Sequence, residues 1–116
     1  MSGSAVLADA LDALLRFGAL MLRSGESAFR VRDDMHRLAP RLGIESFDLL
    51  VTITTMTATA RRGSEQITLV HHVGPLGINA ARLGALERLV NENPAPLASA
   101  ALCAWLDSIE AVAPLH

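Results

Sequence analysis

The segment FDLLVTITTMTATAR (residues 47–61) decides the fold, because its side chains alternate with a period of two. Apolar and polar residues take turns along it, and β-branched residues are frequent. Successive side chains of a strand point to opposite faces of a sheet, and β-branched residues suit that pleated surface. We therefore predict two strands here with a tight turn near Thr54–Thr55. After a turn at residues 63–65, a third strand is predicted over Gln66–Val73.

The segments on both sides of these strands have helical periodicity. Apolar residues recur at spacings of three and four, which is typical of amphipathic helices. The predicted helices run from about Ser4 to Arg23, Ser27 to Leu42, Asn79 to Asn91 and Leu97 to Val112. The order of elements predicts an α+β fold: two N-terminal helices, a three-stranded antiparallel sheet and two C-terminal helices, with the helices covering one face of the sheet.

Single residues predict where these helices end. Gly25 suits the left-handed position after the first helix, and Pro40 should loosen the last turn of the second. Asn79 is expected to cap the third helix at its N-terminus. The short turn between the first two helices predicts that they pack antiparallel.

The second helix carries charged residues that we expect on its solvent side. Arg30 and Asp34, and Asp33 and Arg37, are each four residues apart. Opposite charges at this spacing meet on a helix surface and contribute roughly 0.2–0.5 kcal/mol per pair. This interpretation places Asp34 in solvent.

Composition predicts one aliphatic domain spanning residues 1–116. Hydrophobic residues make up 51% of the chain but aromatic residues only 3%, so the core must be built from aliphatic side chains. The net charge of −2 argues against a nucleic-acid partner, which normally requires a basic face. Cys103 is the single cysteine, so no internal disulfide is possible, and we expect it to be a buried small apolar residue.

The sequence contains no apolar run long enough to cross a bilayer, which takes about 20 residues. Asp9, Asp12 and Arg16 interrupt the first helix and exclude the apolar core of a signal peptide. Taken alone, the chain is expected to be soluble.

Neighbouring histidines suggest a metal site but do not predict one. His71 and His72 lie on one strand, so their side chains should point to opposite faces. No Cys-x-x-Cys or His-x-x-x-His spacing supplies further ligands. We predict no metal and no cofactor, but a hydrogen-bonded structural histidine and a surface one.

A hydrolase is the competing hypothesis, with Glu26, His36 and His71 as candidate catalytic residues. Ser24 and Ser27 flank Glu26, but the segment lacks the strained elbow that presents a nucleophilic serine. Polar residues in such a turn commonly cap helices. We therefore predict that the protein is not an enzyme.

A small polar ligand is the third hypothesis. Thr57 and Thr59 could bind it through their hydroxyl groups, and Arg61 and Arg62 at the strand end could hold a carboxylate. Threonine is also a favoured strand residue, which explains the same pattern without a ligand.

Several short motifs together resemble a known family. They are LRSGES (22–27), Leu42–Gly43, the threonine-bearing strands, LVHHV (69–73) and the helix from Ile78–Asn79 to Leu89. In this order they resemble the soluble N-terminal domain of the threonine/serine exporter family. The resemblance implies a cytoplasmic domain that precedes a bundle of membrane helices, which exports small hydroxylated amino acids using the proton gradient. Related split versions are connected with dicarboxylate export, and the family's soluble domain has been described as hydrolase-like.

The resemblance leads to a functional expectation. The chain would be an accessory or regulatory domain at the cytoplasmic membrane face, partnered by the membrane-spanning domain of the same exporter or by a partner membrane subunit. Its end would coincide with the start of the first membrane helix in the family. A sensor that binds the exported amino acid or a dicarboxylate is an alternative. The abundance of apolar stripes predicts a homo-oligomer, most simply a two-fold dimer through the first or fourth helix.

Overall fold

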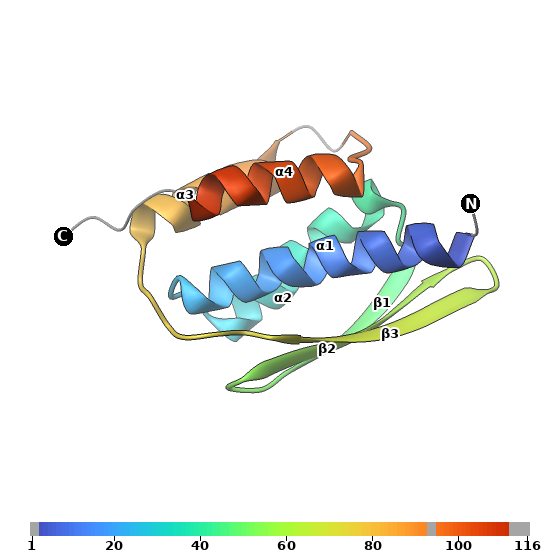
Figure 1. Ribbon diagram of the computed structural model, residues 1–116, viewed down its shortest axis with the longest axis horizontal. Coiled ribbons are helices and arrows are strands. Elements are labelled where there is room, and N and C mark those ends of the chain that lie inside the picture. The colour runs from blue at the N-terminus through green and yellow to red at the C-terminus, as the bar shows by residue number, and fades with distance from the viewer. Residues whose placement is uncertain (1–2, 93–94, 112–116) are drawn as a thin grey trace.

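The computed structural model describes residues 3–92 and 95–111 (Figure 1). It confirms the predicted α+β fold, with an antiparallel sheet in the order β1-β2-β3. The elements in chain order are α1 (Gly3–Arg23), α2 (Ala28–Leu38), the 3₁₀ helix η1 (Ala39–Leu42), β1 (Ser46–Val51), β2 (Thr55–Arg62), β3 (Glu65–His72), α3 (Ala80–Asn91) and α4 (Ser99–Glu110).

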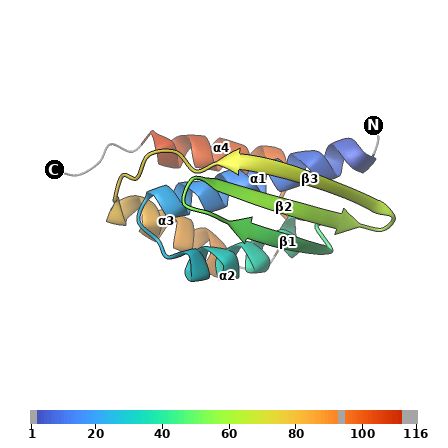
Figure 2. The ribbon, with the colours of Figure 1, turned by 90° about the horizontal axis from the view of Figure 1, so that it is seen from below.

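The elements form three layers (Figures 1 and 2). α1 packs against β2 and β3, and α2 lies beside it against β1. α3 and α4 pack against α1, α2 and each other, so they form a second helical layer behind the first. The helices cover one face of the sheet as predicted (Figure 1), with α1, α2 and η1 packed directly against it.

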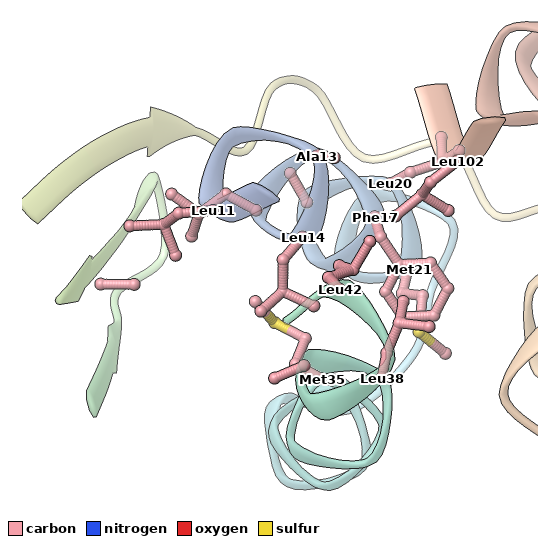
Figure 3. Packing of buried hydrophobic residues seen from close by; sticks show 14 of the residues in the cluster. Leu11, Ala13, Leu14, Phe17, Leu20, Met21, Met35, Leu38, Leu42 and Leu102 are labelled. Carbon is pink, nitrogen blue, oxygen red and sulfur yellow. The ribbon is translucent and has the colours of Figure 1, made fainter. Parts of the chain in front are cut away.

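α1 is the centre of the core because it lies between the sheet and α4. Among residues 6–23 only Asp9 and Asp12 are exposed. Figure 3 shows α2 side chains such as Met35 and Leu38 pointing toward α1, and Leu102 of α4 lying beside it. The buried apolar residues of α1 are Leu7, Ala10, Leu11, Ala13, Leu14, Leu15, Phe17, Ala19, Leu20 and Met21.

This burial corrects one part of the oligomer prediction. α1 has no exposed apolar side chain among residues 6–23, so this part of it offers no apolar patch for the predicted dimer. The prediction of a homo-oligomer now depends on α4, whose outward positions include Ala100, Ala101 and Ala104.

The strands separate a buried face from an outer face. Met56, Ala58 and Ala60 of β2 are buried under the helices. Thr57 and Thr59 alternate with them and face outward, as the period of two predicts. The cross-strand register aligns outer-facing residues of all three strands, including the row Leu50, Thr57 and Val70.

The first hairpin turns earlier than predicted. β1 ends at Val51 and β2 begins at Thr55, so the turn occupies residues 52–54. The Thr52 hydroxyl accepts hydrogen bonds from the backbone N–H groups of Thr54 (3.3 Å) and Thr55 (3.0 Å). A side chain that bonds the backbone two residues on favours a turn at its own position.

The predicted helix boundaries are largely confirmed. Gly25 has a φ of 111°, and the N–H of Glu26 bonds the carbonyl of Met21, which is the Schellman arrangement. α2 loosens into η1 at Pro40, and the Asn79 side chain accepts a hydrogen bond from the N–H of Arg82. α4 begins at Ser99, two residues later than predicted; its predicted end at residue 112 lies outside the described residues.

Candidate functional site

The three candidate catalytic residues lie on different elements and have separate partners. Glu26, in the α1–α2 turn, accepts a hydrogen bond from the N–H of Ser27 at 3.0 Å. His36 stacks on Phe47 with ring centroids 4.2 Å apart, and its Nδ1 lies 2.8 Å from the carbonyl oxygen of Arg32. His71, on β3, lies with its Nε2 2.8 Å from a carboxylate oxygen of Asp12 on α1. Each of these contacts supports local structure, and none of them joins two of the candidates.

The serines and the second histidine behave as structural residues. The Ser27 hydroxyl accepts a hydrogen bond from the N–H of Arg30 at 3.2 Å and caps α2. Ser24 is fully buried, and its backbone carbonyl accepts a hydrogen bond from the N–H of Asn79. His71 is half-buried whereas His72 is exposed, as the alternation of a strand requires.

The candidate ligand-binding residues divide between two faces of the sheet. Thr57, Thr59 and Arg61 face outward, whereas Arg62 follows the inward positions of β2 and lies near Gly43. The Thr59 hydroxyl is 2.7 Å from that of Thr68 on β3. The two arginines therefore do not share a surface from which both could hold one carboxylate.

Arg61 also has protein partners. Its guanidinium donates to Asp48 at 3.0 Å and to Gln66 at 3.1 Å, and together these residues form a polar row across the three strands. A ligand carboxylate would have to compete with Asp48 for this cation.

A groove lies at the end of the molecule where three loops meet. The α1–α2 turn, the β1–β2 hairpin and the segment after β3 converge on the same side in both ribbon views (Figures 1 and 2). Backbone hydrogen bonds join them: Gly77 N–H to the Arg23 carbonyl (2.6 Å), and Val73 N–H to the Thr54 carbonyl (2.9 Å). The groove has a volume of about 670 Å³ and is lined by Leu22, Arg23, Ala28, Val51, Thr52, Ile53, Thr54, Val73, Gly74 and Leu76.

Large apolar side chains stand exposed around this groove. Ile53 is 96% exposed, Phe29 82%, Ile78 77% and Leu76 69%. We call these four residues the apolar end. Ile53 and Leu76 line the groove, Phe29 follows the lining residue Ala28, and Ile78 lies next to Gly25 in the α1–α2 turn. Exposed apolar clusters of this kind mark surfaces that bind a partner.

The groove is suited to binding rather than to chemistry. Most of its lining is aliphatic, its polar side chains are Thr52, Thr54 and Arg23, and it has no carboxylate or histidine to act as a base. Arg23 also pairs with Glu110 of α4 at 3.4 Å.

Sequence reasoning missed the apolar end, although a signal was present. Ile53 occupies a threonine-rich turn, and Leu76 and Ile78 lie in the glycine- and proline-containing loop after β3. Turns normally carry polar residues, so apolar side chains in two such segments indicate a function outside the core.

The prediction from sequence that Asp34 lies in solvent is wrong. Asp34 is only 1% exposed, whereas the i,i+4 pattern predicted it in solvent. α3 packs against α2, and Glu87 of α3 is the carboxyl group that acts on Asp34 there. Burial and this carboxyl neighbour raise the pKa of Asp34 to about 7, although Arg30 and Arg37 act in the opposite direction.

Two features are absent from the residues that the structure describes. No helix within residues 3–92 and 95–111 has the length and apolar character that a membrane crossing requires. The same residues contain no group of three or more histidine, cysteine, aspartate or glutamate side chains arranged to hold a metal ion.

Comparison with known proteins identifies the family. No curated protein and no solved structure matches the chain. A family model described as "Putative threonine/serine exporter" matches residues 12–109, from α1 to near the end of α4, so the matched region includes the groove and its lining. Because this match spans most of the 116 residues, the chain belongs to the threonine/serine exporter family.

Proposed function

We propose that the chain is an accessory domain of a threonine/serine exporter, and that it acts by association rather than by catalysis. Membership of the exporter family supports a role in transport. The observation that carries the mode of action is the apolar end: four large side chains are between 69% and 96% exposed, and two of them, Ile53 and Leu76, line an apolar groove.

The proposed partner is the membrane-spanning part of the exporter, in the same protein or in a partner subunit, met at the cytoplasmic face. Burying one large aliphatic or aromatic side chain contributes about 1.5–3 kcal/mol, so even partial coverage of the apolar end would support stable association. The groove has the apolar lining that accepts an apolar helix or loop.

The same geometry gives less support to the other hypotheses. A hydrolase would need Glu26, His36 or His71 close to a nucleophile, but their contacts hold them in three separate places. A sensor would need both Arg61 and Arg62 beside the threonines, and only Arg61 lies on that face.

Site-specific photocrosslinking in cells that express the complete exporter tests this proposal. A photoreactive amino acid at Ile53 or Leu76 should give crosslinks that mass spectrometry assigns to the membrane-spanning segments of the exporter. The matched control is the same amino acid at Ser64, in the exposed β2–β3 turn at the opposite end of the sheet (Figure 1). Equal crosslinking from Ser64, or no crosslinks from the apolar end to those segments, would contradict the proposal.

A further inference from the structure

We propose that Asp34 and Glu87 form a proton-binding site that latches α3 onto α2. One shared proton joins the two carboxyl groups, and its loss at alkaline pH loosens α3.

The site is buried and lacks other donors. Asp34 is 1% exposed, and neither of its carboxylate oxygens accepts a hydrogen bond from an N–H or hydroxyl group in the described residues. The Oε1 of Glu87 is also buried without such a donor. Three carboxylate oxygens of this pair are therefore buried without a donor, and a shared proton is the group that would satisfy them, because two ionised carboxylates are both acceptors.

Nearby cations do not replace this proton. Arg37 lies 3.9 Å from Asp34 Oδ1, beyond hydrogen-bond distance, and half of its side chain is in solvent. Arg30 lies 3.4 Å from Glu87 Oε2 and is mostly exposed. Water screens both pairs, so neither cation compensates for burying two negative charges.

Among the described residues, Glu87, Arg30 and Arg37 are the charged groups that act on Asp34. α1 presents apolar side chains at its buried positions. Arg41 of η1 donates instead to the backbone carbonyls of Leu89 and Ala95. Burial and Glu87 consequently dominate and raise the pKa of Asp34 to about 7. Asp34 therefore holds its proton below that pH and releases it above.

α3, which carries Glu87 of the latch, is connected directly to the apolar end. α3 begins directly after the loop that holds Leu76 and Ile78, and its buried N-cap Asn79 bonds the carbonyl of Ser24 in the α1–α2 turn. Loosening α3 would therefore disturb the groove, which makes association with the membrane partner dependent on pH. This last step rests on the proposed function, whereas the latch itself does not.

Titration of the full 116-residue chain tests the latch. Carboxyl ¹³C NMR should show Asp34 titrating near neutral pH. Amide hydrogen exchange, corrected for the intrinsic effect of pH, should show that α3 loses protection by up to about tenfold per pH unit as the pH rises from near 4 to the pKa of Asp34, and that the loss levels off above it. Protection within β2 should change less.

Two variants and a control separate the latch from a general effect of pH. Asp34→Asn removes the titrating group, so the pH dependence of α3 exchange should disappear; Glu87→Gln removes the second acid but leaves Asp34 buried, so the pH dependence should weaken and move to lower pH. Asp33→Asn should leave it unchanged. Titration of Asp34 near pH 4, or α3 protection that is independent of pH in the wild type, would overturn the proposal. Because the chain is studied by itself, the outcome is independent of the crosslinking experiment above.

Discussion

Gly18 offers a sharp test of the packing between α1, α2 and the sheet. It is buried in the middle of α1, and a Cβ atom placed on it would lie 3.0 Å from Cε and even closer to Sδ of Met35. The same atom would lie 2.8 Å from Cε of Met56 on β2. Carbon atoms in contact normally lie about 3.5–4.0 Å apart, so Gly18→Ala requires both methionines to move.

Two opposing effects determine the stability of Gly18→Ala. Alanine favours a helix interior over glycine by about 1 kcal/mol. Overpacking a core costs about 1–3 kcal/mol, so the variant should be neutral or destabilised in the wild-type background. Replacing Met35 with alanine removes the closer of the two clashes and leaves only the Met56 methyl group to move. In Met35→Ala, which is itself destabilised by about 2–5 kcal/mol, the same change at Gly18 should therefore cost less than it does in the wild type.

Urea denaturation of the four proteins in this cycle gives the coupling energy between the two sites, which we expect to be about 1–3 kcal/mol. Gly84→Ala is the matched control, because Gly84 lies inside α3 with open space where its Cβ would be. It should stabilise the protein by roughly 0.5–1 kcal/mol. If Gly18→Ala stabilises the wild type as much as Gly84→Ala does, the claim that Met35 and Met56 pack closely against Gly18 is contradicted.

Three further outcomes follow from the structure. The raised pKa of Asp34 contributes stability that is fully present below the ordinary carboxyl pKa and is lost as the pH rises through about 7. Urea denaturation across this range should show that the free energy of unfolding falls by up to about 4 kcal/mol, and Asp34→Asn should remove this pH dependence. Arg16→Ala should loosen α4 by roughly 1–2 kcal/mol, measured by hydrogen exchange, because Arg16 donates to Asp107 and Glu110. Esterase assays should give the same background turnover for wild type and Glu26→Ala, and activity that the variant loses would revive the hydrolase hypothesis.

Local patterns predicted most of the fold. The alternation of apolar and polar residues in FDLLVTI and TMTATAR predicted the strands, because one face of the sheet packs against helices and the other faces outward. The turn of the first hairpin was displaced because a side-chain hydrogen bond of Thr52 determines it, which periodicity does not reveal.

Features that depend on distant segments could not be predicted in this way. Asp34 lies at the margin of the apolar stripe of α2, and only the later α3 decides that it is buried. α1 appeared amphipathic, but a second helical layer covers the side that the sheet leaves free. The apolar end combines residues of three loops, and the topology alone brings these loops together.

Threonine export tests the central claim most directly. Cells would express the complete exporter with either Ile53→Ser or Leu76→Ser. The matched control is Leu50→Ser, which alters an exposed apolar side chain on the outer face of the sheet. Since Ile53 is 96% exposed, its replacement should leave the fold intact, and immunoblots would verify equal protein levels. The account predicts that export falls severalfold in the two variants at the apolar end and is kept in Leu50→Ser. Unchanged export from both apolar-end variants at equal protein levels would contradict it.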